Sequence, residues 1–123
     1  MCAVGWLEKP GFATGQVPAP CMDALVTAHR DRIFRDGSRG LHPCSLCGKT
    51  RPRVRWRGQT VQLSGHGHYL VRDGKTVYVA PELLLHYIRA HRYCPPHELL
   101  RATTEGRFLT EEDLDIRWRD PRA

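Results

Sequence analysis

Residues 44–48 read Cys-Ser-Leu-Cys-Gly, and residues 86–91 read His-Tyr-Ile-Arg-Ala-His. Together they give the pattern C-x2-C-x38-H-x4-H. Two thiolates and two imidazoles make up a closed tetrahedral zinc site. Gly48 follows the second cysteine, where a tight turn around a metal favours a residue without a Cβ. The pattern predicts one structural Zn²⁺ held by Cys44, Cys47, His86 and His91.

The spacing of the two histidines places a condition on this site. Five residues advance an ideal helix by roughly 500°, which leaves the two rings about 140° apart. His91 therefore needs a loosened last turn, which Pro95 and Pro96 just downstream favour. Cys94 is the alternative fourth ligand, because thiolate is an excellent zinc donor. In a simpler interpretation the cysteines are ordinary buried thiols and the histidines ordinary polar residues.

Length and composition are typical of one small domain. The chain has 123 residues, of which 41% are hydrophobic, so a metal would help to stabilise a lean core. No apolar run is long enough to span a membrane, and no signal peptide is visible, so we expect a cytoplasmic protein. Five cysteines fit a disulfide framework poorly. The net charge of +6 is compatible with an acidic protein or nucleic acid as partner.

The hydrophobic pattern predicts an α+β fold with a small antiparallel sheet and several helices. We expect a single domain, 1–123, made of an irregular arm (1–19), a zinc-stapled core (20–102) and a C-terminal helical segment (103–123). Within it we predict a helix from Pro20 to Arg35, strands at 51–57 and 60–63, strands at 68–72 and 75–80 around Asp73-Gly74, a helix opened by Pro81, a short helix at 96–102 and a last one at 110–118.

Arginine alternates with apolar residues in the segment Arg51 to Arg57. In a strand, Arg51, Arg53, Arg55 and Arg57 share one face. This face suits a solvated edge strand, docking on an acidic protein surface, or phosphate binding with Trp56 stacking a base. The pattern alone leaves all three open, with the solvated edge preferred and protein docking ranked next.

His66 and His68 form an H-x-H pair that a metal-dependent hydrolase could use, because the two side chains of a strand point the same way. A Gly-rich turn with solvent-facing histidines is the simpler interpretation. The sequence has no serine elbow, phosphate-binding loop or H-E-x-x-H pattern. We therefore expect no enzymatic activity.

Residues 79–88 read Val-Ala-Pro-Glu-Leu-Leu-Leu-His-Tyr-Ile, followed by His91, Tyr93, Pro95-Pro96 and Glu98-Leu99. This block resembles the "YVAPELIxHYIxxHxYxPPxEF" pattern of an uncharacterised family of small bacterial proteins, and residues 12–18 resemble its "FxTGxVP" stretch. The chain departs from the pattern at Leu99-Leu100, and His68 falls where the family varies. Members of that family look like small immunity-type or accessory proteins.

What the resemblance implies agrees with the ligand pattern. It implies that Cys44 and Cys47 pair with His86 and His91, and that a catalytic constellation is absent. We therefore expect a non-catalytic, zinc-stabilised protein-binding module, inhibitory or immunity-like. The alternatives are a nucleic-acid-binding zinc protein that uses the arginine face and a small hydrolase that uses His66 and His68.

Overall fold

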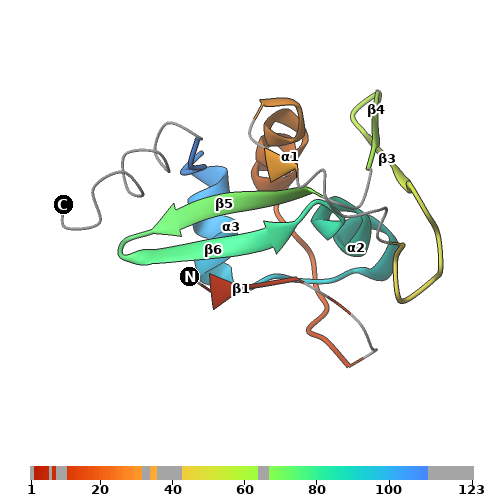
Figure 1. Ribbon diagram of the computed structural model, residues 1–123, viewed down its shortest axis with the longest axis horizontal. Coiled ribbons are helices and arrows are strands. Elements are labelled where there is room, and N and C mark those ends of the chain that lie inside the picture. The colour runs from red at the N-terminus through yellow and green to blue at the C-terminus, as the bar shows by residue number, and fades with distance from the viewer. Residues whose placement is uncertain are drawn as a thin grey trace.

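The computed structural model describes residues 2–5, 7, 11–31, 34–35, 43–63 and 67–110. These residues form an α+β fold with a four-stranded sheet, a two-stranded sheet and helices (Figure 1). The elements, in chain order, are β1 (Cys2–Ala3), α1 (Ala19–Asp31), β2 (Phe34–Arg35), β3 (Arg53–Trp56), β4 (Gln59–Gln62), β5 (Gly67–Asp73), β6 (Thr76–Pro81), α2 (Leu84–His91) and α3 (His97–Thr104).

The β5–β6 hairpin is the centre of the larger sheet, whose strand order is β1-β6-β5-β2. Asp73 pairs with Thr76, and Gly74 takes a φ of +61° in the turn between them, which confirms the predicted hairpin. Strand β1 pairs in parallel with β6, so the N-terminal arm supplies an edge strand that its irregular composition did not predict.

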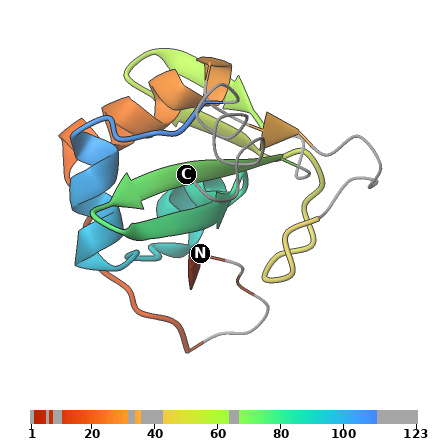
Figure 2. The same cartoon turned by 60° about the vertical axis from the view of Figure 1, so that its left-hand side comes forward.

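Three helices cover the sheet within the described residues, and α3 crosses behind the β5–β6 hairpin in the view of Figure 1. Helices α1 and α3 lie side by side in both views (Figures 1 and 2). The buried face of α1 contains Met22, Leu25 and Val26, as the i, i+3, i+4 pattern predicts, together with Cys21 and Ala28. Nowhere in the described ranges is a helix long and apolar enough to cross a bilayer.

The predicted first helix is too long at its C-terminal end. Helix α1 stops at Asp31, and Phe34–Arg35 forms β2, which pairs with His68 and Gly67 of β5. The free edge of β5 offers backbone hydrogen-bond partners that a local helical pattern cannot reveal. The predicted helix at 110–118 lies almost entirely outside the described residues, and Thr110 is not helical.

Pro81 ends a strand instead of opening a helix. It is the last residue of β6 and pairs with His68, and α2 begins three residues later, at Leu84. The fixed φ of proline suits both a strand end and a first helical turn, so the local pattern could not decide between them. The N–H of Glu82 donates to the Gly67 carbonyl at 2.8 Å, which carries the pairing one residue beyond Pro81.

The N-terminal arm packs on the chain that follows α2. The ring of Phe12 meets that of Tyr93 edge-on, with centroids 5.8 Å apart. Thr14 forms a bridge with Tyr93, and the Cys94 N–H donates to the Ala13 carbonyl at 3.0 Å. Trp6, the other ring expected to anchor the arm, lies outside the described residues.

Candidate metal centre

The turn at residues 44–48 presents two thiols on one side. The Gly48 N–H donates to the Cys44 carbonyl at 2.7 Å, and the Cys44 N–H donates to the Lys49 carbonyl at 3.0 Å. Gly48 has a φ of +76°, a conformation that costs other residues free energy because of their Cβ. The sequence thus closes the loop and brings Cys44 and Cys47 together.

Helix α2 presents both histidines to this turn. His86 lies in its first turn, and His91 is its last helical residue. Arg92 then adopts the left-handed conformation, with φ 57° and ψ 26°, and its N–H donates to the Tyr87 carbonyl. The Tyr93 N–H donates to the same carbonyl at 3.1 Å. The helix therefore ends in a wide turn, as the H-x4-H spacing predicts.

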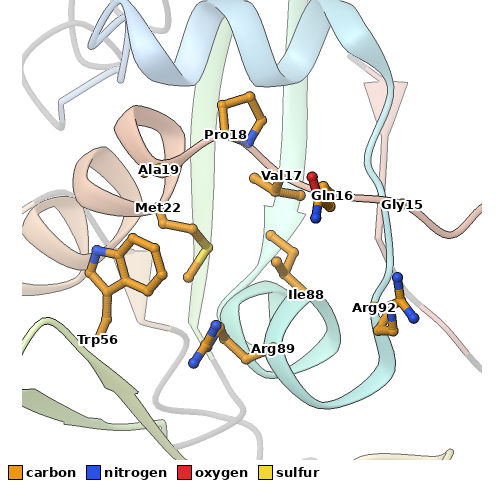
Figure 3. Close-up of a pocket in the computed structure, with 10 residues that line it drawn as sticks. All are labelled: Gly15, Gln16, Val17, Pro18, Ala19, Met22, Trp56, Ile88, Arg89 and Arg92. Atoms are coloured by element: carbon orange, nitrogen blue, oxygen red, sulfur yellow. The ribbon is translucent and has the colours of Figure 1, made fainter.

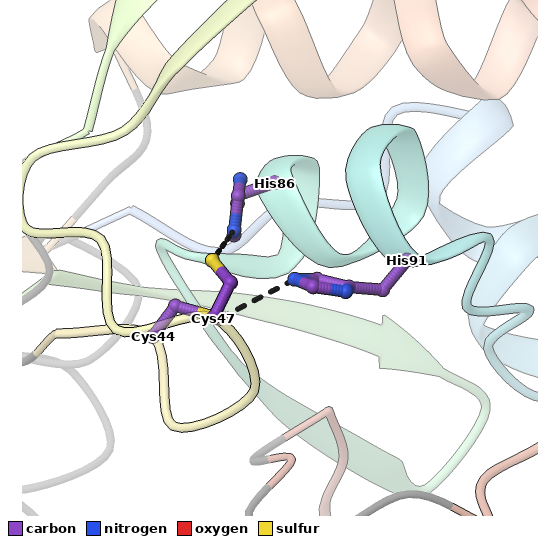
Figure 4. Close-up of side chains that lie close together, drawn as sticks. All are labelled: Cys44, Cys47, His86 and His91. Carbon is purple, nitrogen blue, oxygen red and sulfur yellow. Dashed lines mark hydrogen bonds between the residues drawn. The ribbon is translucent and has the colours of Figure 1, made fainter.

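The four donor atoms lie within 4.8 Å of one another (Figure 4). Cys44 Sγ is 3.5 Å from His91 Nε2, and Cys47 Sγ is 3.4 Å from His86 Nε2. A tetrahedral zinc ion with Zn–S of about 2.3 Å and Zn–N of about 2.05 Å sets each sulfur about 3.5 Å from each nitrogen. The residues therefore fit a single metal ion at their common centre.

The centre is buried on one side and open on the other. Cys44 and His86 are 1% and 4% exposed, whereas Cys47 is exposed and His91 half-buried. Burial, together with the nearby His91 and Lys49, lowers the pKa of His86 to about 4, so its ring is neutral at pH 7 and offers a lone pair. Burial raises the pKa of the Cys44 thiol, so an incoming metal ion must displace its proton.

Cys94, the alternative ligand, lies apart from this group. Its Sγ is 3.7 Å from the Pro95 carbonyl, and a Cβ placed on Gly15 would lie 3.6 Å from it. The donor group found among the described residues contains His91 and not Cys94. The left-handed Arg92 explains this choice, since it turns the chain away from the metal centre before Cys94.

The predicted arginine face forms only in part, because β3 covers Arg53–Trp56, whereas Arg51 and Arg57 lie outside the strand with a φ of 48° each. Arg51, Arg53 and Arg55 are exposed, and the alternating Pro52 and Val54 are buried. Strand β3 pairs with β4 through a turn at Arg57-Gly58, and the Arg57 guanidinium lies 3.1 Å from the Asp23 carboxylate. The exposed face of β3 therefore consists of Arg53 and Arg55, with the exposed Arg51 just before the strand.

The ring of Trp56 is already engaged by other side chains. Its Nε1 donates to Asp23 Oδ1 at 2.7 Å. The guanidinium groups of Arg57 and Arg89 lie 5.6 Å and 5.3 Å from its ring centroid, within the range of cation–π interaction. A nucleic-acid base that stacked on this ring would therefore compete with arginine side chains of the protein itself.

The H-x-H pair is only partly within the described residues. His68 is a half-buried member of β5 that pairs with Phe34 and Pro81 across the sheet, and it does not belong to the donor group. His66 lies outside the described residues.

The sequence did not predict a buried polar pair formed by His29 and Glu82. His29 Nε2 lies 2.9 Å from Glu82 Oε2, and Glu82 is 1% exposed. The two residues are 53 positions apart, and no local pattern connects them. The one signal in the sequence was the position of Glu82, a charged residue between Pro81 and the apolar run Leu83 to Leu85.

A domain family described as "Domain of unknown function (DUF7919)" matches residues 1–104, which include all the elements described above. No curated protein and no solved structure matches the chain. The match covers most of the chain and all four donor residues, so the protein belongs to the family DUF7919.

Proposed function

We propose that this protein is a non-catalytic, zinc-stabilised protein-binding module of the cytoplasm, inhibitory or immunity-like in its action. The observation that carries the proposal is the closed set of four donors around one centre. A catalytic zinc site keeps one position for water or substrate, whereas a structural site fills all four with protein ligands. Two thiolates and two imidazoles in a tetrahedral arrangement favour zinc over harder cations.

The metal would tie together two parts of the chain that lie far apart in the sequence. The loop at 44–48 is irregular, and its partner helix α2 begins about forty residues later. Bound zinc would fix the loop on the helix and would contribute directly to the free energy of unfolding. Such a site supports a binding surface without taking part in chemistry.

Elemental analysis of protein purified without added metal tests the zinc site. We expect one zinc per chain. Cys44→Ser should lose most of the metal and several kcal/mol of stability, because the free energy of metal binding contributes to the free energy of folding. The matched control Cys94→Ser exchanges a thiol outside the donor group and should keep full metal content. Full metal and full stability in Cys44→Ser would refute the structural zinc site.

Affinity capture from the source cell tests the binding function. We expect a stoichiometric protein partner that remains bound at moderate salt, and that is lost with metal-depleted protein. Turnover of a small substrate by the zinc-loaded protein, abolished in Cys44→Ser, would replace the proposal with a catalytic one.

Nucleic-acid binding is the second candidate, and the exposed arginines in and just before β3 favour it. Among the described residues Arg51, Arg53 and Arg55 make no ion pair with a carboxylate. Binding through phosphates weakens steeply as salt rises, with a slope set by the number of phosphates contacted. An oligonucleotide titration at two salt concentrations therefore distinguishes this candidate, and absence of binding at low salt removes it.

A further inference from the structure

A groove of about 610 Å³ lies on the side of α2 that faces away from the metal centre. It runs from Trp56 at one end to Arg92 at the other, between the segment 15–19 and α2 (Figure 3). Val17 and Ile88 meet across its middle, and Met22 borders it near Trp56 (Figure 3). The groove thus has an apolar floor and an approximate size that suits one or two side chains of a ligand.

Two exposed arginines give this groove a positive charge. Arg89 lies beside Trp56, and Arg92 points toward the segment at Gly15 and Gln16 (Figure 3). Neither guanidinium forms an ion pair with a carboxylate of the described residues. Two such charges on either side of an apolar floor complement a ligand that has carboxylates on either side of an apolar group.

The backbone along one wall of the groove is available for hydrogen bonding. Gly15 donates its N–H to the Arg92 carbonyl at 3.1 Å, and the Pro18 carbonyl accepts from Cys21 and Met22. Between them, the backbone groups of Gln16 and Val17 make no hydrogen bond to other described residues. Val17 precedes a proline, which favours an extended backbone. An extended backbone with free N–H and C=O groups is a template for a second extended chain.

The apolar floor, the two arginines and the extended backbone together indicate which kind of partner fits the groove. We propose that the groove lined by Val17, Met22, Ile88, Arg89 and Arg92 binds an extended acidic segment of a partner protein, which inserts an apolar side chain between two carboxylates. The carboxylates pair with Arg89 and Arg92, and the apolar side chain packs on Val17 and Ile88. The inference rests on the proposed protein-binding function and names the surface that performs it.

Helix α2 couples this groove to the metal centre. His86 and His91 project from one side of the helix toward Cys44 and Cys47, while Ile88 and Arg89 line the groove on another side (Figures 3 and 4). Loss of the metal would release the loop at 44–48 and leave α2 less firmly held. Removing the metal therefore weakens binding in the groove, although no ligand of the metal touches the partner.

Fluorescence anisotropy with a short labelled peptide of alternating leucine and glutamate tests the proposal. Wild-type protein binds this peptide, and Arg89→Glu/Arg92→Glu lowers the affinity by about tenfold or more, because interface arginines commonly carry that share of the binding free energy. The matched control Arg53→Glu/Arg55→Glu makes the same charge change on the β3 face and leaves the affinity within about twofold. A peptide of alternating leucine and lysine does not bind.

The single variant Arg92→Glu shows whether a loss of affinity in the double variant comes from a folding defect. Its side chain forms no hydrogen bond, ion pair or cation–π contact with other described residues, and glutamate is no worse than arginine in the left-handed conformation. This variant keeps the wild-type circular dichroism spectrum, shows only a small fall in melting temperature because a carboxylate at the C-terminal end of α2 opposes the helix dipole, and still loses several-fold in affinity. Equal affinity of wild type and Arg92→Glu overturns the proposal.

Two other outcomes separate this inference from the function on which it rests. If a captured protein partner binds wild type and Arg89→Glu/Arg92→Glu equally, the protein-binding function stands and the groove is not its site. If an oligothymidine probe binds more tightly than the acidic peptide and only Arg53→Glu/Arg55→Glu weakens it, the acidic-peptide proposal is wrong and the arginine face binds nucleic acid.

Discussion

Glu82 Oε2 lies 2.9 Å from His29 Nε2, so a carboxylate at the end of β6 is joined to the last turns of α1. The other oxygen, Oε1, accepts from the Gly67 N–H at 3.2 Å. The side chain of Glu82 has no solvent exposure and that of His29 has 11%. One buried acid thereby connects a helix, a strand end and the first residue of β5.

Replacing Glu82 should therefore destabilise the fold strongly. Glu82→Ala removes the acceptor for both His29 and the Gly67 N–H, and we expect a loss of about 3 kcal/mol in the free energy of unfolding. Glu82→Gln keeps the shape and one carbonyl oxygen and should lose only about 1 kcal/mol. Urea denaturation measures both. A Glu82→Ala variant as stable as the wild type would contradict a structural role for the pair.

The exposed Cys47 thiol should report whether the metal centre is filled. Its Sγ points at His86 Nε2 from 3.4 Å, and bound zinc would hold it as an unreactive thiolate. We expect iodoacetamide to modify Cys47 slowly in metal-loaded protein and rapidly after chelation. Mass spectrometry of the digested protein measures this difference.

Two other cysteines serve as controls for that measurement. Cys2 is exposed and should react at the same rate with or without metal. Cys21 is buried and should stay unmodified until the protein unfolds. Equal alkylation of Cys47 before and after chelation would show that its thiol does not bind the metal.

Cys21 should also make the protein less stable in alkali. Burial raises the pKa of its thiol from 9.0 to about 11, in spite of a hydrogen bond with Thr104 that lowers it. Above pH 9 the unfolded chain loses this proton while the folded chain keeps it, so the folded state binds more protons and its stability falls as pH rises toward 11. The slope should approach about 1.4 kcal/mol per pH unit.

Cys21→Ala is the control for the alkaline slope. The variant should be less stable at neutral pH, because it loses a buried sulfur, but its stability should change less between pH 9 and pH 10. Above pH 10, Tyr87 adds a slope of the same sign in both proteins, since burial raises its pKa from 10.0 to about 12. Parallel stability curves for the two proteins between pH 9 and pH 10 would refute the effect.

The sequence predicted those parts of the structure that depend on near neighbours. Asp73-Gly74 specifies a hairpin through its own conformational preferences, and the alternation through Val54 gives a strand with one buried face. The cysteine and histidine spacing predicted the donor group because ligand geometry restricts such spacings. Strand β1, by contrast, exists because β6 offers a free edge to Cys2 and Ala3, which no pattern in the first residues reveals.

The same limit explains what the sequence left open at the metal centre. The choice between His91 and Cys94 depends on the backbone of Arg92, and a left-handed arginine is rare enough that composition argues against it. Likewise, the groove needs α2 and the segment 15–19 to come together, about seventy residues apart in the chain. Long-range packing decides both features.

The left-handed conformation at the end of α2 predicts that a substitution to glycine stabilises the protein. Arg92 has a φ of 57° directly after the helix, in a conformation that costs residues with a Cβ roughly 1–2 kcal/mol. Glycine pays little of this cost but has more freedom in the unfolded chain, so Arg92→Gly should raise the free energy of unfolding by about 1 kcal/mol. Ala90→Gly, two residues earlier and inside the helix, should lower it by about 1 kcal/mol. Thermal and urea unfolding of both variants, in metal-loaded protein, checks the opposite signs. If both glycines destabilise the protein equally, the wide turn that brings His91 to the metal centre is not left-handed at Arg92.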